Sequence, residues 1–328
     1  MTERLRWGIL GTGGIAAAMT RDLRVLGSPV TAVGSRTQGR ADAYAAEHDI
    51  ATAHGSYESL VADPDVDVIY VATPHPMHAA DATLALEAGK HVLVEKSFTV
   101  NAAEAQGVVD VARERGLVVL EAMWTRWLPH MVRIREIISA GTLGDVRTLI
   151  ADHTQKLPTD PAHRIQNPDL GGGALLDLGI YPVSFAWDLF GAPASIQANA
   201  SKTTTGVDRQ TAMIFGYADG QQAVMQAALD TRGPNRATIL GTEARIEIDG
   251  VWYSPTTFRV IASDGTVIED YDQPVQGRGM QFQAAALEEL VATGRLEGEV
   301  LPPSESVAIM ASLDEVRSQI GLAYPFER

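Results

Sequence analysis

The chain has 328 residues, of which 45% are hydrophobic and 20% charged, with no cysteine and a formal net charge of −15. This composition excludes disulfides, thiolate metal sites and a cysteine nucleophile, and the acidic balance argues against a nucleic-acid partner, which needs a basic face. No apolar stretch approaches the ~20 residues of a membrane helix, and segment 1–6 mixes charges unlike a secretory signal, so we expect a cytoplasmic protein of two domains with no membrane partner.

The first 122 residues alternate short apolar runs with helix-like stretches. Apolar runs without polar alternation predict strands buried on both faces, and they occur at 6–11, 30–35, 67–72, 91–94 and 117–120. Helices are predicted between them at 14–26, 38–48, 77–88 and 102–114. This alternation predicts a parallel, doubly wound α/β sheet, and we assign residues 1–122 to the first domain.

The pattern changes in residues 123–328, which we assign to a second domain. Helices are predicted at 129–140 and 171–190, and strands at 146–153, 194–201, 211–217, 222–229, 237–240, 244–248, 258–262 and 267–271. Short turns such as Asp249-Gly250 favour antiparallel pairing. Two closing helices are predicted at 280–293 and 304–321. The second domain is therefore expected to be α+β, built around one large sheet.

The segment 11–16 carries the pattern G-x-G-x-x-A between a predicted strand and a predicted helix. The first glycine permits a tight turn, the second lets the backbone approach a pyrophosphate, and the small third residue lets helix and strand pack closely. A tight turn without a ligand is the alternative. Because the pattern opens a complete βαβ unit, we predict a dinucleotide site that includes Gly11, Thr12, Gly13, Gly14 and Ile15.

The end of the second predicted strand indicates which dinucleotide binds. An NAD site usually has an acid here for the ribose hydroxyls, but no Asp or Glu occurs from residue 23 to residue 41. Arg36 can instead pair with a 2′-phosphate and stack on adenine, and Ser35 can add a hydroxyl group. An ordinary surface arginine is the alternative. We predict NADP as the cofactor, with NAD as the second choice.

Two polar segments contain candidate catalytic residues. Glu95 and Lys96 follow the fourth predicted strand, at the sheet edge where ligands bind, and burial there can lower the pKa of a lysine toward a working range. Asp177 and Tyr181 stand four residues apart on a predicted helix, so they share a face that could hold a polyol and relay a proton. A solvated lysine and a packed tyrosine beside a capping aspartate are the alternatives.

Thr73, His75 and His78 follow the third predicted strand, again at its carboxyl end. With Asp81 the two histidines could suggest a metal site, but no third histidine stands at ligand spacing, so we expect no metal. We expect this loop to contact the nucleotide instead. Further cofactor contacts are expected from Glu95, Lys96, Trp124 and Arg126, and substrate contacts from Trp127, His153 and the loop 156–167.

Together these segments resemble the Gfo/Idh/MocA oxidoreductase family over essentially the whole chain. The resemblance rests on segments 7–16, 72–78, 89–96 and 172–181, and segments 121–127 and 143–145 are most similar to dimeric dihydrodiol dehydrogenases and NADP-dependent D-xylose dehydrogenases. It implies a Rossmann domain followed by a substrate-binding domain with a large, open, mostly antiparallel sheet. It also implies a homodimer, or a tetramer, that associates through this sheet.

The resemblance also implies roles for individual residues. Lys96 corresponds to the family's catalytic lysine, and Asp177 and Tyr181 to its Asp-x-x-x-His pair, with tyrosine in place of histidine. Arg36 corresponds to the NADP-selecting arginine. Ser97 replaces the usual proline after the lysine, which relaxes a restraint on the lysine backbone.

We therefore expect an NADP-dependent oxidoreductase that moves hydride between the nicotinamide and a secondary alcohol or carbonyl of a sugar, cyclic polyol or trans-dihydrodiol. A redox-neutral enzyme with tightly held NAD is one alternative, and Arg36 argues against it. An NADP-binding sensor without catalysis is another, and the presence of Lys96 and Tyr181 argues against that. The chain lacks a G-x-S-x-G elbow, a P-loop and a Tyr-x-x-x-Lys pair, which argues against the enzyme classes that use them.

Overall fold

The computed structural model describes residues 4–327 and divides the chain into two compact units. The first consists of Met1–Trp124 and Gln276–Val307, and the second of Thr125–Val275 and Ala308–Arg328. The chain passes from the first unit to the second after Trp124, two residues beyond the predicted boundary at residue 122. The segment 276–307 belongs to the first unit, whereas the predicted division into two consecutive domains placed it in the second. Its helix α8 (Gln281–Ala292) packs against α1 (Gly14–Leu26) of the first unit.

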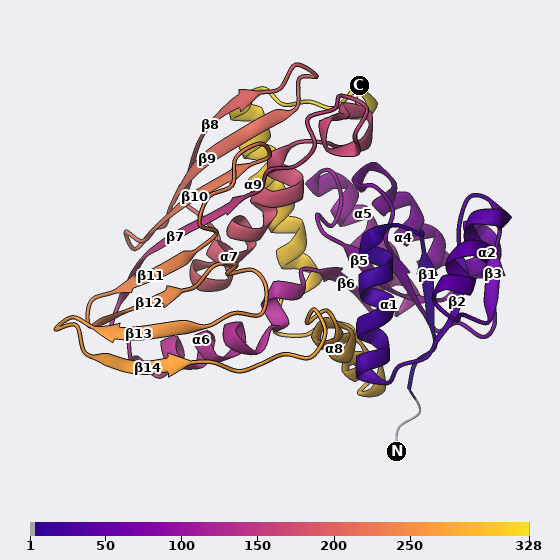
Figure 1. The fold of residues 1–328 in the computed structure, drawn as a ribbon, viewed down its shortest axis with the longest axis horizontal. Coiled ribbons are helices and arrows are strands. Elements are labelled where there is room, and N and C mark those ends of the chain that lie inside the picture. The colour runs from indigo at the N-terminus through magenta and orange to yellow at the C-terminus, as the bar shows by residue number, and fades with distance from the viewer. Residues whose placement is uncertain (1–3, 328) are drawn as a thin grey trace. The chain divides into compact units, whose positions relative to one another are not determined.

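The first unit is built on a six-stranded sheet with the order β3-β2-β1-β4-β5-β6. Every neighbouring pair is parallel, which confirms the predicted doubly wound sheet (Figure 1). Ile9, Val33, Ile69 and Leu93, from its four central strands, are fully buried. The strands are β1 (Trp7–Leu10), β2 (Val30–Gly34), β3 (Thr52–His54), β4 (Val68–Val71), β5 (His91–Glu95) and β6 (Val119–Ala122).

Helices connect consecutive strands of the first unit, and α8 joins this unit from a later part of the chain. Besides α1 and α8 they are α2 (Gln38–Glu47), α3 (Tyr57–Val61), α4 (His78–Glu87) and α5 (Ala102–Arg115). α5 shows how the sequence fixes an element, because the side chain of Asn101 accepts a hydrogen bond from the Glu104 amide and Gly116 ends the helix with φ 65°. The sequence analysis did not predict β3 and α3, which are only three and five residues long.

The second unit is built on an eight-stranded sheet with the order β14-β13-β12-β11-β7-β10-β9-β8. All neighbouring pairs are antiparallel except β7 and β10, which confirms a mostly antiparallel sheet. The strands are β7 (Val146–Thr154), β8 (Ser195–Lys202), β9 (Asp208–Gly216), β10 (Gln222–Ala228), β11 (Ala237–Gly241), β12 (Ala244–Ile248), β13 (Phe258–Ala262) and β14 (Val267–Tyr271).

One face of this sheet carries the helices of the second unit. They are α6 (Pro129–Ser139), α7 (Ile180–Phe190) and α9 (Pro303–Ile320), whose residues from 308 onward belong to this unit (Figure 1). The helix predicted from residue 171 starts later, because Gly171 and Gly173 have φ of 65° and 125°. It opens with a π-helical turn at Leu175–Gly179, which leads into α7.

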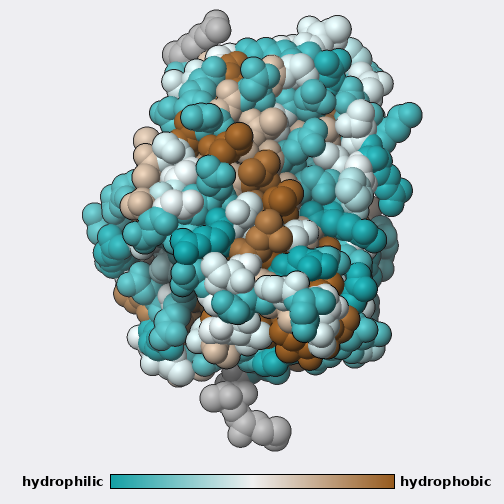
Figure 2. Space-filling view, turned by 90° about the vertical axis from the view of Figure 1, so that its left-hand side faces the viewer, coloured by the Kyte–Doolittle hydropathy of each residue, from teal (hydrophilic) through white to brown (hydrophobic). Residues whose placement is uncertain are grey.

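The other face of the eight-stranded sheet carries no helix of the described chain (Figure 1). Ile150, Val224 and Ile214 are directly paired across β7, β10 and β9, and they are 47%, 40% and 44% exposed. Figure 2, which faces this side of the molecule, shows hydrophobic residues gathered in a band. We call Ile150, Val224 and Ile214 the open-face patch.

Within residues 4–327, no helix is both long and apolar enough to cross a membrane.

Candidate active site

The glycine turn of the first unit connects β1 to α1. Gly11 has φ 108°, and a Cβ there would lie 2.9 Å from the carbonyl oxygen of Ala72, so a side chain would collide with the neighbouring strand end. Gly13 and Gly14 are exposed, and a Cβ on either would meet no described heavy atom within 4 Å. α1 has no capping side chain and no acid in its first turn. Its amide groups are therefore available for an anionic ligand.

Arg36 lies directly beyond β2, at the same carboxyl-terminal edge of the parallel sheet as the glycine turn. It is exposed, while its neighbour Ser35 is buried and donates its amide to the carbonyl oxygen of His54. Among the described residues, no carboxylate forms an ion pair with Arg36. Its guanidinium can therefore receive a phosphate without first breaking an ion pair.

Lys96 stands at the same edge of the sheet, immediately after β5. Its amide donates a hydrogen bond of 3.3 Å to Oε2 of the buried Glu95, whose other oxygen accepts from the hydroxyl of Tyr70. Burial raises the pKa of Glu95, and the positive charges of Lys96 and Arg278 act in the opposite direction. The Lys96 side chain is partly exposed, and the peptide bond from Lys96 to Ser97 is cis. The carboxylate thus fixes the backbone from which the amine extends.

The loop after β4 is built around His78. Its ring nitrogens lie 2.9 Å from the carbonyl oxygen of Ser97 and 2.8 Å from that of Thr73. Burial lowers the pKa of His78, and the hydrogen bonds to the carbonyl oxygens of Thr73 and Ser97 act in the opposite direction. The ring joins the β4 loop to the segment that carries Lys96. Thr73 donates its hydroxyl to Asp81, whose pKa burial raises to about 6. His75 packs edge-on against His78 with ring centroids 5.5 Å apart.

Trp124 lies beyond the end of β6 and belongs to the first unit. The guanidinium carbon of Arg278 is 5.1 Å from the centroid of its ring, which is a cation–π arrangement. The carboxylate of Asp22 on α1 accepts hydrogen bonds from the amides of Arg278 and Met280, and so holds the loop before α8. The carboxyl-terminal edge therefore bears an additional cation that the sequence analysis did not identify.

Asp177 and Tyr181 lie in the second unit, on the π-turn and in the first turn of α7. Both are largely buried, and Arg164 approaches Asp177 with a nitrogen–oxygen distance of 3.4 Å. Both residues lie on the segment predicted to be helical, which begins with a π-turn in place of regular α-helix, and their shared face stays a prediction. Such turns occur frequently at functional sites.

Tyr181 belongs to an aromatic cluster with His153 on β7 and Tyr253 in the loop after β12. The His153 and Tyr253 rings stack with centroids 3.7 Å apart, and Tyr181 packs against His153 at 4.8 Å and against Tyr253 at 5.3 Å. Nε2 of Gln155 lies 2.9 Å from Nε2 of His153. Burial raises the pKa of Tyr253 to about 12, so its phenol stays protonated at neutral pH. The cluster therefore holds the phenol ring of Tyr181 against His153 and Tyr253, beside the polar side chain of Gln155.

The remaining expected residues of the second unit differ in their surroundings. Arg126 is buried, and its guanidinium donates to the Ser184 hydroxyl at 3.0 Å and pairs with Asp188 at 3.0 Å. Ser184 and Asp188 belong to the same unit as Arg126, and the predicted contact of Arg126 with the cofactor stays a prediction. Trp127 is partly exposed, as a residue that contacts substrate needs to be.

The first unit fits a nicotinamide dinucleotide. The open glycine turn suits the pyrophosphate, Arg36 suits a 2′-phosphate, and Lys96 lies on the same edge. Within residues 4–327, no group of three or more His, Asp or Glu side chains is arranged to hold a metal ion.

Tyr253, Gln155 and Arg278 were missed by the sequence analysis. Tyr253 and Arg278 occupy loops far along the chain from the motifs that they join. Gln155 stands two residues after His153 and could have been found from the alternation of a strand, which places residues i and i+2 on one face.

Two family descriptions match the chain. "Oxidoreductase family, NAD-binding Rossmann fold" matches residues 5–123, and "GFO/IDH/MocA C-terminal domain" matches residues 131–247. Both matches agree with the fold predicted for each part of the chain.

Characterised relatives match nearly the whole length. The D-xylose 1-dehydrogenase (NADP(+)) of Hypocrea jecorina is 36% identical over 98% of this chain and 93% of its own. The trans-1,2-dihydrobenzene-1,2-diol dehydrogenase of Bos taurus is 36% identical over 99% of both chains.

Solved structures share the architecture. A 3-ketoreductase from Actinomadura kijaniata, crystallised with NADP and TDP-benzene, has a TM-score of 0.87 at 26% identity, over 97% of this chain and 98% of its own. The aldose-aldose oxidoreductase of Caulobacter crescentus has a TM-score of 0.87 at 25% identity, over 97% of both chains. The chain therefore belongs to the Gfo/Idh/MocA oxidoreductase family and is an NAD(P)-dependent dehydrogenase or reductase.

Proposed function

We propose that the protein is an NADP-dependent oxidoreductase that interconverts a secondary alcohol and a carbonyl on a sugar, a cyclic polyol or a trans-dihydrodiol. The observation that carries this proposal lies within the first unit. There the open glycine turn, Arg36 and Lys96 share one edge of the parallel sheet. The same edge offers no acid that would select NAD, because residues 23–41 contain no Asp or Glu.

When bound, NADP⁺ supplies the hydride acceptor. Oxidation of the substrate carbon breaks its C–H and O–H bonds, and the residues of this chain handle the hydroxyl proton. In our proposal Lys96 and Tyr181 take this proton, and Asp177 accepts a hydrogen bond from a hydroxyl group to orient the substrate. Reduction of a carbonyl runs the same steps in reverse, with the proton returned to the new alcohol.

The relatives support this substrate class. One is named for D-xylose and NADP(+), and another for trans-1,2-dihydrobenzene-1,2-diol. Both of these compounds contain a CH–OH group next to a second hydroxyl group or a ring oxygen. In this chain, Trp127 and His153 are proposed to line the substrate pocket. Cofactor contacts are proposed for the glycine turn, Ser35 and Arg36. They are also proposed for Thr73, His75, His78, Glu95, Lys96, Trp124 and Arg126.

The protein is also proposed to be a homodimer that associates through the eight-stranded sheet. The open-face patch supports this, because three paired apolar side chains on neighbouring strands are exposed together. The site is proposed to act on a small molecule in the cytoplasm.

The experiment that tests the proposal is NADP⁺ reduction against a panel of aldoses, inositols and trans-dihydrodiols, repeated with NAD⁺. We expect NADPH formation with at least one compound, and a higher kcat/KM for NADP⁺ than for NAD⁺. Equal or better use of NAD⁺ would contradict the proposed cofactor. Tight NADPH binding without turnover of any compound would contradict the proposed enzyme and favour a sensor.

A further inference from the structure

A buried carboxylate that the proposed mechanism does not use lies against the segment that carries Asp177 and Tyr181. Asp208, the first residue of β9, is 0% exposed. Its Oδ2 accepts a hydrogen bond of 2.8 Å from the amide of Leu175 and another of 2.8 Å from the hydroxyl of Thr211. Leu175 is the first residue of the π-turn, so this carboxylate holds the amide with which the turn begins.

The chain before the π-turn is shaped to admit this carboxylate. Gly173 has φ 125°, and a Cβ there would overlap with Oδ1 of Asp208. The preceding Gly172 is fixed from another side, because the hydroxyl of the fully buried Tyr324 donates a 2.9 Å hydrogen bond to its carbonyl oxygen. The glycines therefore allow two buried polar groups to hold the start of the turn.

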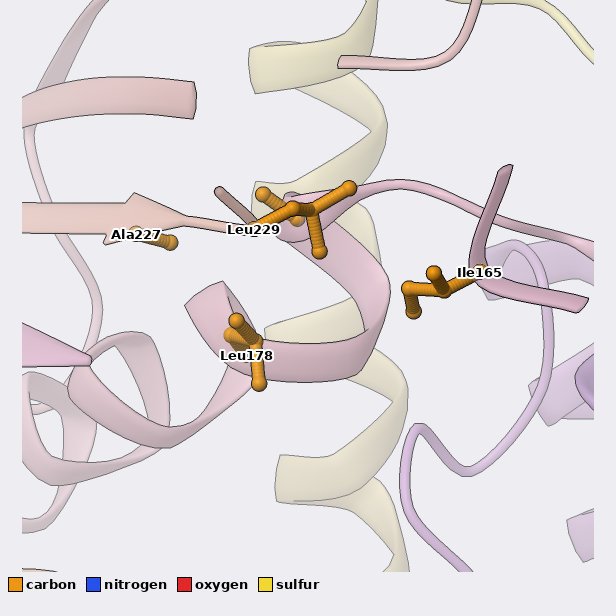
Figure 3. Packing of buried hydrophobic residues seen from close by; sticks show 5 residues of the cluster. Ile165, Leu178, Ala227 and Leu229 are labelled. Carbon is orange, nitrogen blue, oxygen red and sulfur yellow. The ribbon is translucent and has the colours of Figure 1, made fainter. Parts of the chain in front are cut away.

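The π-turn is held on its apolar side as well. Leu178 packs in a buried cluster with Ile165, Ala227 and Leu229, which Figure 3 shows around the turn. Asp177 is the neighbour of Leu178 in the turn. The hydrogen bond at Leu175 thus holds the start of the same turn whose apolar side is packed at Leu178, and Asp177 lies between these two points.

We propose that Asp208 is a positioning residue of the reaction: its buried carboxylate holds the Leu175 amide and thereby sets where Asp177 and Tyr181 lie. This inference rests on the proposed function, because it assigns to Asp208 a role that acts through these two residues. It adds a residue that no sequence motif of the chain indicated.

The electrostatics of Asp208 make this role measurable. Burial raises its pKa to about 7, and the hydrogen bonds from Thr211 and Leu175 act in the opposite direction. Among the described residues, Tyr324 is a titratable group that interacts electrostatically with Asp208. Arg317, Glu327 and Asp177 lie around that tyrosine, and Arg317 and Glu327 form an ion pair.

The raised pKa of Asp208 determines how the stability of the folded state changes with pH. The folded-state pKa of Asp208 lies above the unfolded value of 3.8, so the folded state binds this proton more tightly than the unfolded chain does. Stability therefore falls as the pH rises from the unfolded toward the folded pKa, and the loss is complete above it. An amide in place of the carboxyl group removes this loss, so Asp208→Asn should not lower the Tm at pH 8.

The test compares kcat, KM and Tm of the wild type and Asp208→Asn across pH 6–9, with NADP⁺ and D-xylose or trans-1,2-dihydrobenzene-1,2-diol. We expect kcat at pH 8 to fall by roughly 10- to 100-fold, as for a misplaced catalytic group, while the KM for NADP⁺ and the Tm stay near the wild-type values. The wild-type kcat should rise through pH 7, and the Asp208→Asn profile should lack this rise. A wild-type kcat and profile in Asp208→Asn, or a kcat loss matched by a fall in Tm, would overturn the inference.

Two further variants separate positioning from folding. Asp67→Asn removes an aspartate that pairs with Arg6 at the opposite edge of the first sheet, and it should lower Tm without changing kcat. Thr211→Val removes a donor that lowers the pKa of Asp208, so it should shift the rise in kcat to higher pH. An unshifted rise in Thr211→Val would contradict the assignment of that rise to Asp208.

Hydrogen–deuterium exchange gives a readout that needs no substrate. We expect the peptide spanning residues 174–182 to exchange faster in Asp208→Asn than in the wild type at pH 8, with no change in the first sheet. If the wild type turns over no compound, the proposed function fails while this exchange result still decides whether Asp208 orders the turn. Unchanged exchange in that peptide would refute the positioning role.

Discussion

Arg36 is the residue on which the proposed choice of cofactor depends. It follows β2, is exposed, and has no carboxylate partner among the described residues, and no acid stands nearby in the sequence to bind ribose hydroxyls. A guanidinium at this position can form charge-assisted hydrogen bonds with a 2′-phosphate, which NAD lacks. The proposed preference for NADP therefore depends on one side chain.

Replacing Arg36 with alanine should weaken NADPH binding by roughly 10- to 100-fold, because a hydrogen bond to a charged group contributes about 1.5–3 kcal/mol. The affinity for NADH should change little, since NADH has no phosphate at that position. Isothermal titration calorimetry with both cofactors measures this, and Arg113→Ala, at an exposed arginine on α5, is the matched control. Equal losses for NADPH and NADH would show that Arg36 does not read the phosphate.

Residues could be predicted where the chemistry follows directly from the position along the chain. Arg36 and Lys96 stand at strand ends, and these ends share one edge of a parallel sheet, so their placement followed from the strand pattern. Tyr253 and Asp208 could not be predicted in this way. Their partners, His153 and Leu175, are distant in sequence and meet them only through the register and loops of the second unit.

The turn between β1 and α1 makes a prediction at the level of an element. Gly13 has φ −84°, which alanine can adopt, and a Cβ there would meet no described heavy atom within 4 Å. Gly13→Ala should therefore keep the Tm of the wild type. It should nevertheless weaken NADPH binding, because the new methyl group occupies the space in which the pyrophosphate approaches the backbone.

Differential scanning fluorimetry and NADPH titration test this pair of expectations. Gly107→Ala on α5 is the control, since a Cβ there also meets nothing within 4 Å. It should leave NADPH binding unchanged and raise stability by about 0.5–1 kcal/mol, because glycine is unfavourable inside a helix. Wild-type NADPH affinity in Gly13→Ala would contradict the assignment of the turn to the pyrophosphate.

The starts of β1 and β4 are joined by an ion pair whose effect depends on pH. Nε of Arg6 donates to Asp67 at 2.9 Å and Nη2 at 2.8 Å, and the Arg6 amide donates to the same carboxylate. Arg6 holds the pKa of Asp67 below its usual value of 3.8. The stabilisation is thus present in full above the unfolded pKa, and it is lost as the pH falls through the lower folded-state pKa.

We expect Asp67→Asn to lower the free energy of unfolding at pH 7 by about 1 kcal/mol, as for a partly exposed, bidentate pair. The difference from the wild type should shrink as the pH falls below the unfolded pKa. Urea unfolding at several pH values measures it. A difference that grows on acidification would show that the sign of the linkage is wrong.

The regular elements were largely predictable, and the exceptions have physical reasons. β3 has three residues with an exposed or partly exposed pattern, so it lacks the apolar run that revealed the other strands. The parallel pairing of β7 with β10 joins strands that are distant in the chain, whereas turn signals report only on neighbours. The π-turn at Leu175–Gly179 depends on buried hydrogen bonds that the helical period of the sequence does not reveal.

For the molecule as a whole, the apolar patch on the open sheet face stands out against a net charge of −15. Such a charge keeps monomers apart unless an apolar surface offsets the repulsion. The open-face patch lies on three neighbouring strands and includes Val224 at its centre. A second copy of the chain is the proposed partner for this surface.

Val224→Asp should convert the proposed dimer to a monomer, because it places an additional negative charge inside the interface. Light scattering after size exclusion should give about twice 35.1 kDa for the wild type and 35.1 kDa for the variant. Val132→Asp is the matched control, since Val132 on α6 is 41% exposed, against 40% for Val224. A monomeric wild type would contradict the proposed dimer.

We propose that Lys96 takes the hydroxyl proton while hydride passes between the substrate and a bound NADP. The most direct measurement is the rate of NADPH formation in one turnover by the wild type and by Lys96→Ala, together with the Kd of each for NADPH. Loss of a principal acid–base group should lower the rate by about 10²- to 10⁴-fold, while NADPH binding stays largely intact. A Lys96→Ala variant that forms NADPH at nearly the wild-type rate would contradict this role of Lys96.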